Sequence, residues 1–342
     1  MDTQVNSERY SSQLILPGIG QDGQRKLGDS TVVVVGCGAL GCTIASALVR
    51  AGVGHLRIID RDSVEIRNLQ RQILFTEADA HLNQPKAVAA ERALHQANSQ
   101  VQVEGVVADF DSRNALSLVE GANLLLDGLD NFEARYLLND VSWKTGIPWI
   151  YGGAVGTVGM TATFIPDQTP CFRCILPDPP PPGSVATCDV TGVISSAPWM
   201  IASVQAAEAI KMLIGTSNRN RDLIVLDPWN LSFQKVLIST RENCPTCQQR
   251  RFDFLEGSAG TKVIRLCGQN AVQIWNAGQG PFPLDQLEEH LRLLGKVTRN
   301  EHLLQITIEE YTLVLFYDGR AVIRGTDDVA LARSLYARYV GI

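Results

Sequence analysis

Residues 31–41 read TVVVVGCGALG, five residues with strong strand preference followed by three glycines within six positions. A strand, a glycine turn and a helix open a dinucleotide-binding fold, because glycines let the backbone approach a phosphate and the helix N-terminus supplies oriented N–H groups. Asp60 ends the next expected strand, about 20 residues further on, where a carboxylate can accept hydrogen bonds from ribose hydroxyls. We therefore expect a nucleotide site at this turn.

Short β-branched runs alternate with helical patterns on both sides of this turn. Strands are expected at Thr31–Val35, Leu56–Ile59, Val101–Val107, Asn123–Asp127, Trp149–Tyr151, Met160–Phe164, Leu223–Asp227 and Leu231–Leu237. Helices are expected at Leu40–Arg50, Gln84–Asn98, Arg113–Val119, Phe132–Thr145 and Pro198–Leu213. This alternation predicts an α/β fold with a doubly wound, Rossmann-like, mostly parallel sheet.

Composition narrows the class of protein. Hydrophobic residues make up 45% and charged residues 19%, which is typical of a globular chain and excludes extensive disorder. The net charge of −6 argues against broad contact with nucleic acid. Two uncharged runs, 31–49 and 145–166, are interrupted by glycine and small polar residues, so we expect no membrane span. The N-terminus carries no apolar export signal, and we expect a soluble, cytoplasmic protein.

The length of 342 residues predicts about two domains. We place the nucleotide-binding domain at residues 1–255 and a small α+β domain, of unknown role, at residues 256–342. The second domain has expected strands at Val263–Leu266, Val272–Trp275, Leu303–Ile308, Tyr311–Tyr317 and Ala321–Arg324, and expected helices at Leu284–Leu294 and Asp327–Val340. Its only cysteine, Cys267, lies between strand-like residues, so the domain lacks the cysteine-centred loop of a sulfurtransferase.

Two C-x-x-C pairs, Cys171/Cys174 and Cys244/Cys247, lie in proline-marked loops. A single such pair could be redox-active or simply structural. Two pairs can supply four thiolates to one closed tetrahedral zinc site, which has no open position for a substrate. We therefore predict a structural zinc knuckle.

Three further motifs follow the glycine turn along the chain. Residues 60–72 read DRDSVEIRNLQRQ, Gln84-Pro85-Lys86 begins an expected helix, and Gly128-Leu129-Asp130-Asn131 follows an expected strand. In this order the motifs resemble the ThiF/MoeB family, the bacterial relatives of ubiquitin-activating enzymes, from Glu8 to Gln248.

The resemblance implies an adenylyltransferase that uses ATP and Mg²⁺ to activate the C-terminal glycine of a ubiquitin-like sulfur-carrier protein. Pyrophosphate would be released and the carrier primed for sulfur transfer. The implied nucleotide-binding positions are Gly36, Gly38, Ala39, Gly41, Asp60, Asn68, Arg71, Lys86, Asp130 and Asn131. Arg71 and Lys86 match the phosphate-contacting positions, and Asp130 matches the acid associated with magnesium. An arginine fork and a lysine point charge both suit the negative charge that develops during this transfer.

The family pattern also draws attention to Cys188 and Ser12. Cys188 resembles a loop cysteine that in some members bonds covalently to the carrier, and it is a candidate catalytic nucleophile. The alternative is an inert loop thiol, because the neighbouring Asp189 disfavours a thiolate. Ser12 stands where members have an arginine that reaches the ATP of the partner subunit, and Ala39 replaces a common glycine.

The implied partners are a carrier with a Gly-Gly C-terminus and a second copy of the chain in a homodimer. A cysteine desulfurase or another sulfur donor is a further candidate partner. Two other interpretations of the function stay open. A degenerate nucleotide-binding scaffold is supported by Ser12, and an NAD-dependent oxidoreductase is supported only by the glycine turn. The carrier's pathway, whether thiamin, molybdopterin, tRNA thiolation or cysteine synthesis, is not encoded in these motifs.

Overall fold

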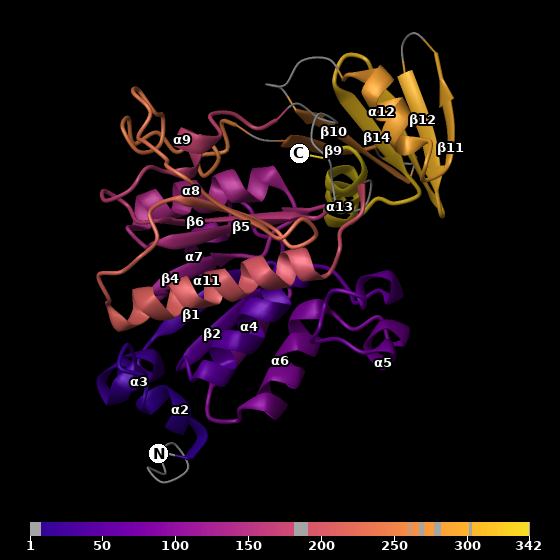
Figure 1. Cartoon of the computed structure of the whole chain (residues 1–342). Helices are drawn as coiled ribbons and strands as arrows, with labels where there is room; N and C mark the ends of the chain where they lie inside the picture. Colours follow the sequence, from indigo (N-terminus) through magenta and orange to yellow (C-terminus); the bar gives the residue numbers. More distant parts are fainter. Residues whose placement is uncertain are drawn as a thin grey trace.

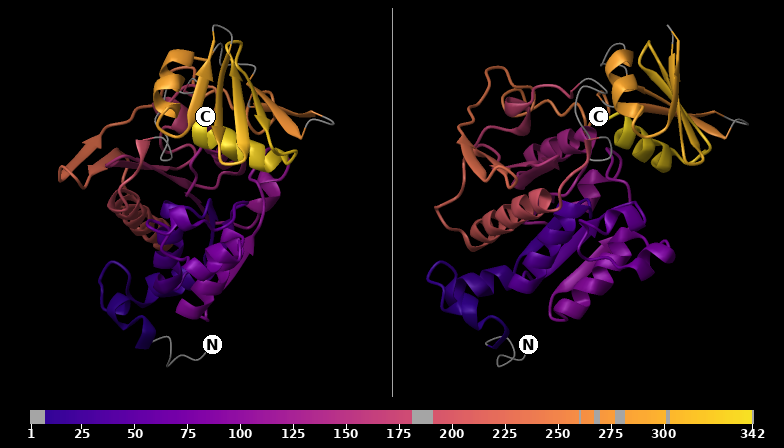
Figure 2. Two further views of the ribbon diagram at one scale, coloured as in Figure 1. Left: turned by 90° about the vertical axis from the view of Figure 1, so that its right-hand side faces the viewer. Right: turned by 45° about the vertical axis from the view of Figure 1, so that its right-hand side comes forward.

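A computed structural model describes residues 8–180, 191–259, 261–266, 270–276, 282–300 and 303–341. Two sheets, each with its own hydrophobic core, make up this part of the chain (Figures 1 and 2). The first has eight strands in the order β3-β2-β1-β4-β5-β6-β7-β8, and the second has six in the order β11-β12-β13-β14-β10-β9. This confirms the predicted α/β class with an added α+β unit at the C-terminal end.

The first sheet is parallel over five of its strands. Its strands are β1 (Thr31–Val35), β2 (His55–Ile59), β3 (Gln102–Val106), β4 (Leu124–Asp127), β5 (Trp149–Val155), β6 (Val158–Phe164), β7 (Leu223–Asp227) and β8 (Ser232–Val236). Strands β1 to β5 pair in parallel, whereas β6, β7 and β8 extend the sheet antiparallel. The carboxyl ends of β1, β2 and β4 therefore meet at one edge, where ligands of open α/β sheets bind.

Helices cover both faces of this sheet. They are α2 (Ser11–Leu14), α3 (Gly20–Gly28), α4 (Ala39–Ala51), η1 (Ile66–Asn68), α5 (Glu77–His81), α6 (Lys86–Ala97), α7 (Ala115–Leu118), α8 (Phe132–Thr145), α9 (Phe172–Ile175) and α11 (Ser196–Ile214). Strand β1 shows why both faces are needed. Val32 and Val34 pack with α4, α6 and α11, whereas Val33 and Val35 pack with α8 on the other side. A strand buried on both faces reads as a continuous apolar run, as this one does.

The second sheet is antiparallel throughout and is covered by two helices. Its elements are β9 (Thr261–Leu266), β10 (Ala271–Asn276), α12 (Leu284–Leu291), β11 (Lys296–Arg299), β12 (Leu303–Ile308), β13 (Tyr311–Phe316), β14 (Arg320–Arg324) and α13 (Val329–Tyr339). Leu287 of α12 and Leu335 of α13 share one core with Leu313 and Leu315 of β13. Helix α13 lies between this sheet and the first unit (Figure 1).

Two expectations differ from the structure in extent. The helix expected at Arg113–Val119 is reduced to α7, and the strand expected at Leu231–Leu237 is reduced to β8 because Leu231 has a positive φ of 52°. The uncharged runs at 31–49 and 145–166 are strand–helix and strand–strand pairs. No described helix has the length and apolar character needed to cross a membrane. The domain limits 1–255 and 256–342 stay a prediction.

Candidate active site

A pocket of about 430 Å³ opens at the carboxyl edge of the first sheet. Its wall includes eight of the nucleotide-binding positions expected from the sequence: Gly36, Gly38, Ala39, Asp60, Arg71, Lys86, Asp130 and Asn131. Gly41 lies inside the turn, and Asn68 is buried behind the pocket wall. The structure therefore brings together residues that are up to 95 positions apart in the chain, from Gly36 to Asn131.

The three glycines of the turn have different roles. A Cβ at Gly41 would lie 2.0 Å from the Gly36 carbonyl oxygen, and a Cβ at Gly36, whose φ is +92°, would lie 2.5 Å from the Gly128 oxygen. These two glycines are required for the turn to pack against the end of β4. A Cβ at Gly38 would meet nothing closer than 3.8 Å. Packing does not explain Gly38, and its bare backbone faces the pocket, where a phosphate could approach it.

Asp60 joins the glycine turn to the loop that follows β2. Its Oδ2 accepts the Cys37 N–H at 2.7 Å, and its Oδ1 accepts the Asp62 N–H at 2.8 Å. Burial raises the pKa of Asp60 to about 6, while Lys86 acts in the opposite direction. The carboxylate keeps lone pairs for ribose hydroxyls and at the same time holds two backbone segments of the pocket in place.

Lys86 begins α6 and is buried. Its Nζ lies 3.0 Å from Asp62 Oδ2. Burial alone would lower the pKa of the ammonium, but the carboxylates of Asp60 and Asp62 raise it above its usual value. Lys86 is therefore charged before any ligand arrives. No motif marks Asp62, and its position two residues after Asp60 is the one signal of this role in the sequence.

Arg71 is held at the pocket wall by contacts with its own segment and with α11. Its Nη2 donates to Asn68 Oδ1 at 3.0 Å, and its carbonyl oxygen accepts the Trp199 indole N–H at 2.8 Å. Asn68 thereby positions Arg71, and its contact with the nucleotide stays a prediction. The adjacent Gln72 was not singled out from the sequence. It is buried, lines the pocket, and its Oε1 has no hydrogen-bond partner in the part of the chain that the structure describes.

A buried ion pair supports the loop that carries Asp130. Asp130 itself is exposed at the pocket rim, and the Asn131 side chain caps α8 by accepting the Ala134 N–H at 2.9 Å. Beneath them, Arg135 Nε donates to Asp127 Oδ2 at 3.0 Å, and Arg135 Nη2 donates to the Leu129 oxygen at 2.6 Å. Asp127 and Arg135 are two of the four charged residues in the stretch LLLDGLDNFEARYLL, and no motif marks them as a pair.

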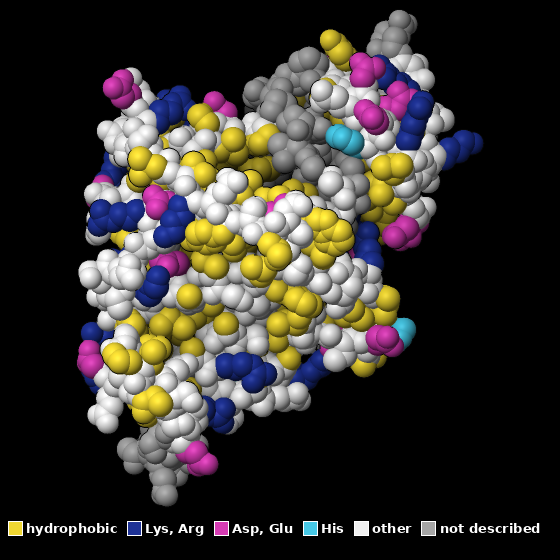
Figure 3. Space-filling view, in the orientation of Figure 1, with side chains coloured by type: hydrophobic (Ala, Val, Ile, Leu, Met, Phe, Trp, Pro, Cys, Tyr) yellow, Lys and Arg dark blue, Asp and Glu magenta, His cyan; other side chains and the backbone are white. Residues whose placement is uncertain are grey.

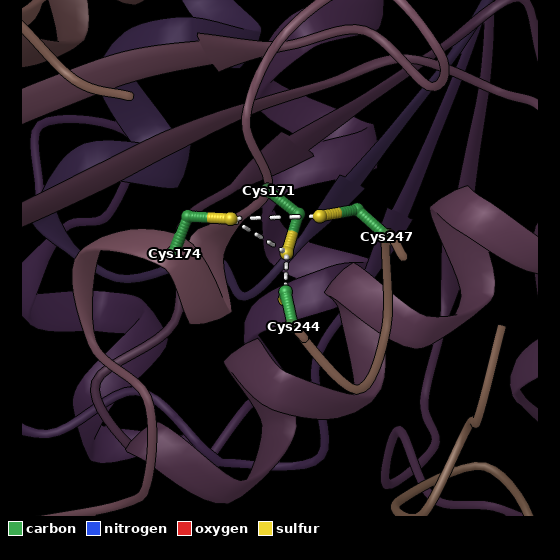
Figure 4. Close-up of side chains that lie close together, drawn as sticks. All are labelled: Cys171, Cys174, Cys244 and Cys247. Atoms are coloured by element: carbon green, nitrogen blue, oxygen red, sulfur yellow. Dashed lines mark hydrogen bonds between the residues drawn. The ribbon is translucent and has the colours of Figure 1, made fainter. Parts of the chain in front are cut away.

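Four cysteine sulfurs form a separate cluster (Figure 4). The Sγ atoms of Cys171 and Cys244 are 3.4 Å apart, those of Cys174 and Cys247 are 3.5 Å apart, and those of Cys171 and Cys174 are 3.9 Å apart. All four lie within 4.8 Å of one another. Zinc–sulfur bonds of about 2.3 Å place the sulfurs of a tetrahedral site about 3.8 Å apart. The four residues therefore fit zinc, as predicted, and leave no ligand position open.

Asp140 of α8 connects the cysteine cluster to the rest of the fold. It accepts a hydrogen bond from the Thr246 hydroxyl, between the two cysteines of the second pair, at 3.0 Å. It also accepts the Phe254 N–H at 2.9 Å, at the start of the passage to the second sheet. The cluster is thus a clamp that ties distant loops to α8.

Two further residues, Cys188 and Ser12, were singled out from the sequence. Cys188, the candidate nucleophile, lies outside the described residues. Ser12 is exposed on α2. Arg9, which could have replaced the expected arginine, donates to the Ala97 oxygen at 3.2 Å, at the opposite end of α6 from Lys86. Arg9 therefore does not reach the pocket of its own chain.

Figure 3 shows the charged side chains on one face of the molecule. On this face, Lys and Arg side chains are dispersed among hydrophobic and acidic ones.

The model of the ThiF family matches residues 10–246. The chain belongs to the ThiF family. A Bacillus subtilis relative, the sulfur carrier protein ThiS adenylyltransferase, is 42% identical over 336 residues, which cover 97% of this chain and 99% of the relative. A Thermus thermophilus sulfur carrier protein adenylyltransferase is 38% identical over 72% of this chain and 92% of its own length.

Solved structures extend the likeness to the fold. Escherichia coli MccB, crystallised with AMPCPP and the MccA peptide, aligns with a TM-score of 0.62 over 71% of this chain and 75% of MccB, at 23% identity. This level of identity establishes a shared fold only. The B. subtilis ThiF-family relative, in contrast, aligns over nearly the whole chain, so its similarity includes the second sheet.

Proposed function

We propose that this ThiF-family protein adenylates the C-terminal carboxylate of a sulfur carrier protein, with ATP as the adenylyl donor. The observation that carries the proposal is the convergence of the glycine turn, Asp60, Arg71 and Lys86 on one pocket at the carboxyl edge of the sheet. The near full-length similarity to the B. subtilis ThiS adenylyltransferase supports the same substrate class. The carrier is expected to end in Gly-Gly.

The reaction needs positive charge where the phosphates sit. A carboxylate oxygen of the carrier attacks the α-phosphorus, the bond from that phosphorus to the bridging oxygen breaks, and pyrophosphate leaves with the electron pair. Lys86 and Arg71 stabilise the developing charge, and the Gly38 N–H adds an oriented donor. Asp60 holds the ribose. Asp130 is the proposed ligand for magnesium, which when bound neutralises phosphate oxygens.

The pocket extends beyond the nucleotide positions toward an apolar wall. Met160 of β6, Phe172 and Ile175 of α9, and Leu223 of β7 line this part. A tail that ends in two glycines has no side chain to exclude, so its carboxylate can pass along this wall to the α-phosphate.

The deciding measurement is ATP–pyrophosphate exchange that depends on a Gly-Gly-ended carrier from the same genome. We expect exchange with the cognate carrier and none with a carrier that lacks the terminal glycine. Absence of exchange with every such carrier contradicts the proposal. Saturable ATP binding without exchange selects the degenerate scaffold, and NADH binding without ATP binding selects the oxidoreductase.

Three further elements of the proposal are the homodimer, the sulfur donor and Cys188. Sedimentation of the purified chain tests the dimer, and co-purification from the native organism tests the carrier and a cysteine desulfurase or other donor. Intact-mass analysis of the wild type and Cys188→Ser, after incubation with ATP and carrier, tests for a covalent adduct. An adduct in the wild type that is absent from the variant supports a nucleophilic Cys188; no adduct in either contradicts it.

A further inference from the structure

The last helix of the second unit forms part of the nucleotide pocket. Ala337 and Arg338 of α13, and Gly341 just beyond it, line the same pocket as Gly38 and Lys86. The Arg338 side chain is only 16% exposed. In Figures 1 and 2, α13 lies on the side of the second unit that is turned toward the first unit. The pocket is therefore built from both units.

Helix α13 holds the loop that leads to Arg71. Arg338 Nη2 lies 3.3 Å from Glu65 Oε1, and Arg67 is hydrogen bonded to the side chain of Tyr339. Arg67 also pairs with Glu65. Glu65 precedes the turn η1, and Arg67 lies within it, next to the buried Asn68. Since Asn68 binds Arg71, α13 contacts the same segment that carries Arg71.

The position of Arg338 parallels that of Lys86. Each cation lines the pocket, and each is held by a neighbouring carboxylate, Asp62 for Lys86 and Glu65 for Arg338. Burial alone would raise the pKa of Asp62, but the charges of Lys86, Arg61 and Arg338 lower it.

Besides Arg338 and the proposed phosphate-binding Arg71, the pocket wall has two arginines, and both support the fold. Arg61 Nη1 lies 2.7 Å from Asp109 Oδ1, and Arg135 forms the buried pair with Asp127. The sequence has Ser12 where the family pattern has an arginine directed at the ATP of the partner subunit, and Arg9 does not reach the pocket of its own chain. Because a triphosphate carries several negative charges, a further cation in the pocket would strengthen its binding.

We propose that Arg338 is an ATP-binding residue supplied by the second unit, and that α13 closes the nucleotide pocket over the phosphates. The proposal rests on the proposed adenylation. When ATP binds, the Arg338 guanidinium exchanges its contact with Glu65 for phosphate oxygens, as Lys86 exchanges its contact with Asp62. The second unit thereby becomes a component of the adenylation site.

The test compares full-length variants by titration calorimetry with the non-hydrolysable analogue AMPCPP and by the KM for MgATP in pyrophosphate exchange. Arg338→Ala is expected to weaken AMPCPP binding about tenfold or more, since a hydrogen bond to a charged group is lost. Arg338→Lys should recover part of this loss. Arg320→Ala, at the β13–β14 turn where Arg320 pairs with the exposed Asp318, is the matched control and should bind as the wild type does.

Two variants separate binding from positioning. Glu65→Gln removes the partner of Arg338 and should leave AMPCPP affinity equal to or above that of the wild type. Arg333→Ala removes a contact across the interface, 3.8 Å to Asp109, on the same helix but in a neighbouring cavity. It should weaken AMPCPP binding less than Arg338→Ala does. If Glu65→Gln or Arg333→Ala matches the loss caused by Arg338→Ala, then Arg338 acts only through docking and the proposal is wrong.

Failure of this inference can be told apart from failure of the proposed function. Carrier-dependent exchange in the wild type with unchanged AMPCPP affinity in Arg338→Ala overturns the inference alone. Zinc content and thermal melting verify that each variant is folded, and Arg338→Lys gives a second reading where the alanine variant is unstable.

Discussion

Lys86 and Arg71 are the two side chains on which the proposed reaction depends most directly. Both are already held at the pocket, Lys86 by Asp62 and Arg71 by Asn68. We predict that Lys86→Ala and Arg71→Ala each slow carrier-dependent ATP–pyrophosphate exchange by about a hundredfold or more, because each removes charge stabilisation from the transition state.

Matched controls for these two substitutions lie on the surface of the same unit. Arg50 is exposed at the end of α4 away from the glycine turn, and Lys144 is exposed near the end of α8. Arg50→Ala and Lys144→Ala should exchange at the wild-type rate. A loss below tenfold in both pocket variants would contradict their assigned roles.

The titration of Asp60 makes the free energy of unfolding depend on pH. Burial raises its pKa to about 6, against about 3.9 in an unfolded chain. The folded protein therefore holds a proton more tightly than the unfolded one, and this contribution, complete below pH 4, is lost as the pH rises through 6. The free energy of unfolding of the wild type, minus that of Asp60→Ala, should fall by about 1 kcal/mol from pH 5 to pH 7. Urea titrations of both ligand-free proteins at the two pH values measure this difference in the free energy of unfolding. A difference that rises with pH contradicts the raised pKa of Asp60.

The roles of single residues could be predicted only where a motif marked them. Asp60 and Lys86 stand in ordered motifs, and the structure places both in one pocket. Asp62, Gln72 and Arg338 were missed because their roles depend on what faces them. Arg338 in particular lies 273 positions from Glu65, and nothing in its local sequence points to that pairing.

At the scale of elements, the loop between β4 and α8 depends on the buried pair of Asp127 and Arg135. Removal of one partner leaves an uncompensated buried charge, which costs about 3–5 kcal/mol. We predict a loss of this size in the free energy of unfolding for Arg135→Ala, measured by urea titration. Arg25→Ala on α3 breaks an exposed pair with Asp22 and should cost less than about 1 kcal/mol. Equal losses in the two variants would show that the buried pair contributes no more to the free energy of unfolding than the exposed pair.

The cysteine cluster joins the segment around α9 to the turn at Cys244–Cys247, 73 positions further along the chain. We predict one zinc ion per chain by elemental analysis, lost in Cys244→Ser together with a lower melting temperature, because a structural zinc site contributes folding energy. Cys37→Ser, which changes a buried cysteine outside the cluster, should keep its zinc. Zinc retained in Cys244→Ser, or absent from the wild type, would contradict the assignment.

Elements with a strong periodic pattern were predicted well, and short polar ones were not. The strand expected at Thr31–Val35 has these limits in the structure, because five β-branched residues followed by glycines leave little choice. Helix α3, with glycines at both ends and one inside, was missed, as was β11, whose sequence KVTR is mostly exposed. Both depend on neighbouring elements rather than on their own composition.

At the scale of the molecule, two separate cores are joined across a polar interface. The core beneath β12 and β13 shares no residue with the cores on the two faces of the first sheet. Among the described residues, the ion pairs Arg338–Glu65 and Arg333–Asp109 cross between them. Interfaces of this kind couple units weakly, so each unit is expected to unfold in its own transition.

A calorimetric scan tests this division and the shared pocket together. We predict two transitions for the wild type, and Leu313→Ala, in the core of the second sheet, should lower only one of them, at a cost of about 2–5 kcal/mol. A ligand at 100 times its dissociation constant stabilises the state that binds it by about 2.7 kcal/mol. Because α13 lines the nucleotide pocket, AMPCPP should raise both transitions in the wild type and, in Arg338→Ala, mainly that of the first unit. A ligand shift confined to the first unit in the wild type would mean that α13 contributes nothing to binding, whereas a single transition that moves as one would place the whole chain in one cooperative unit.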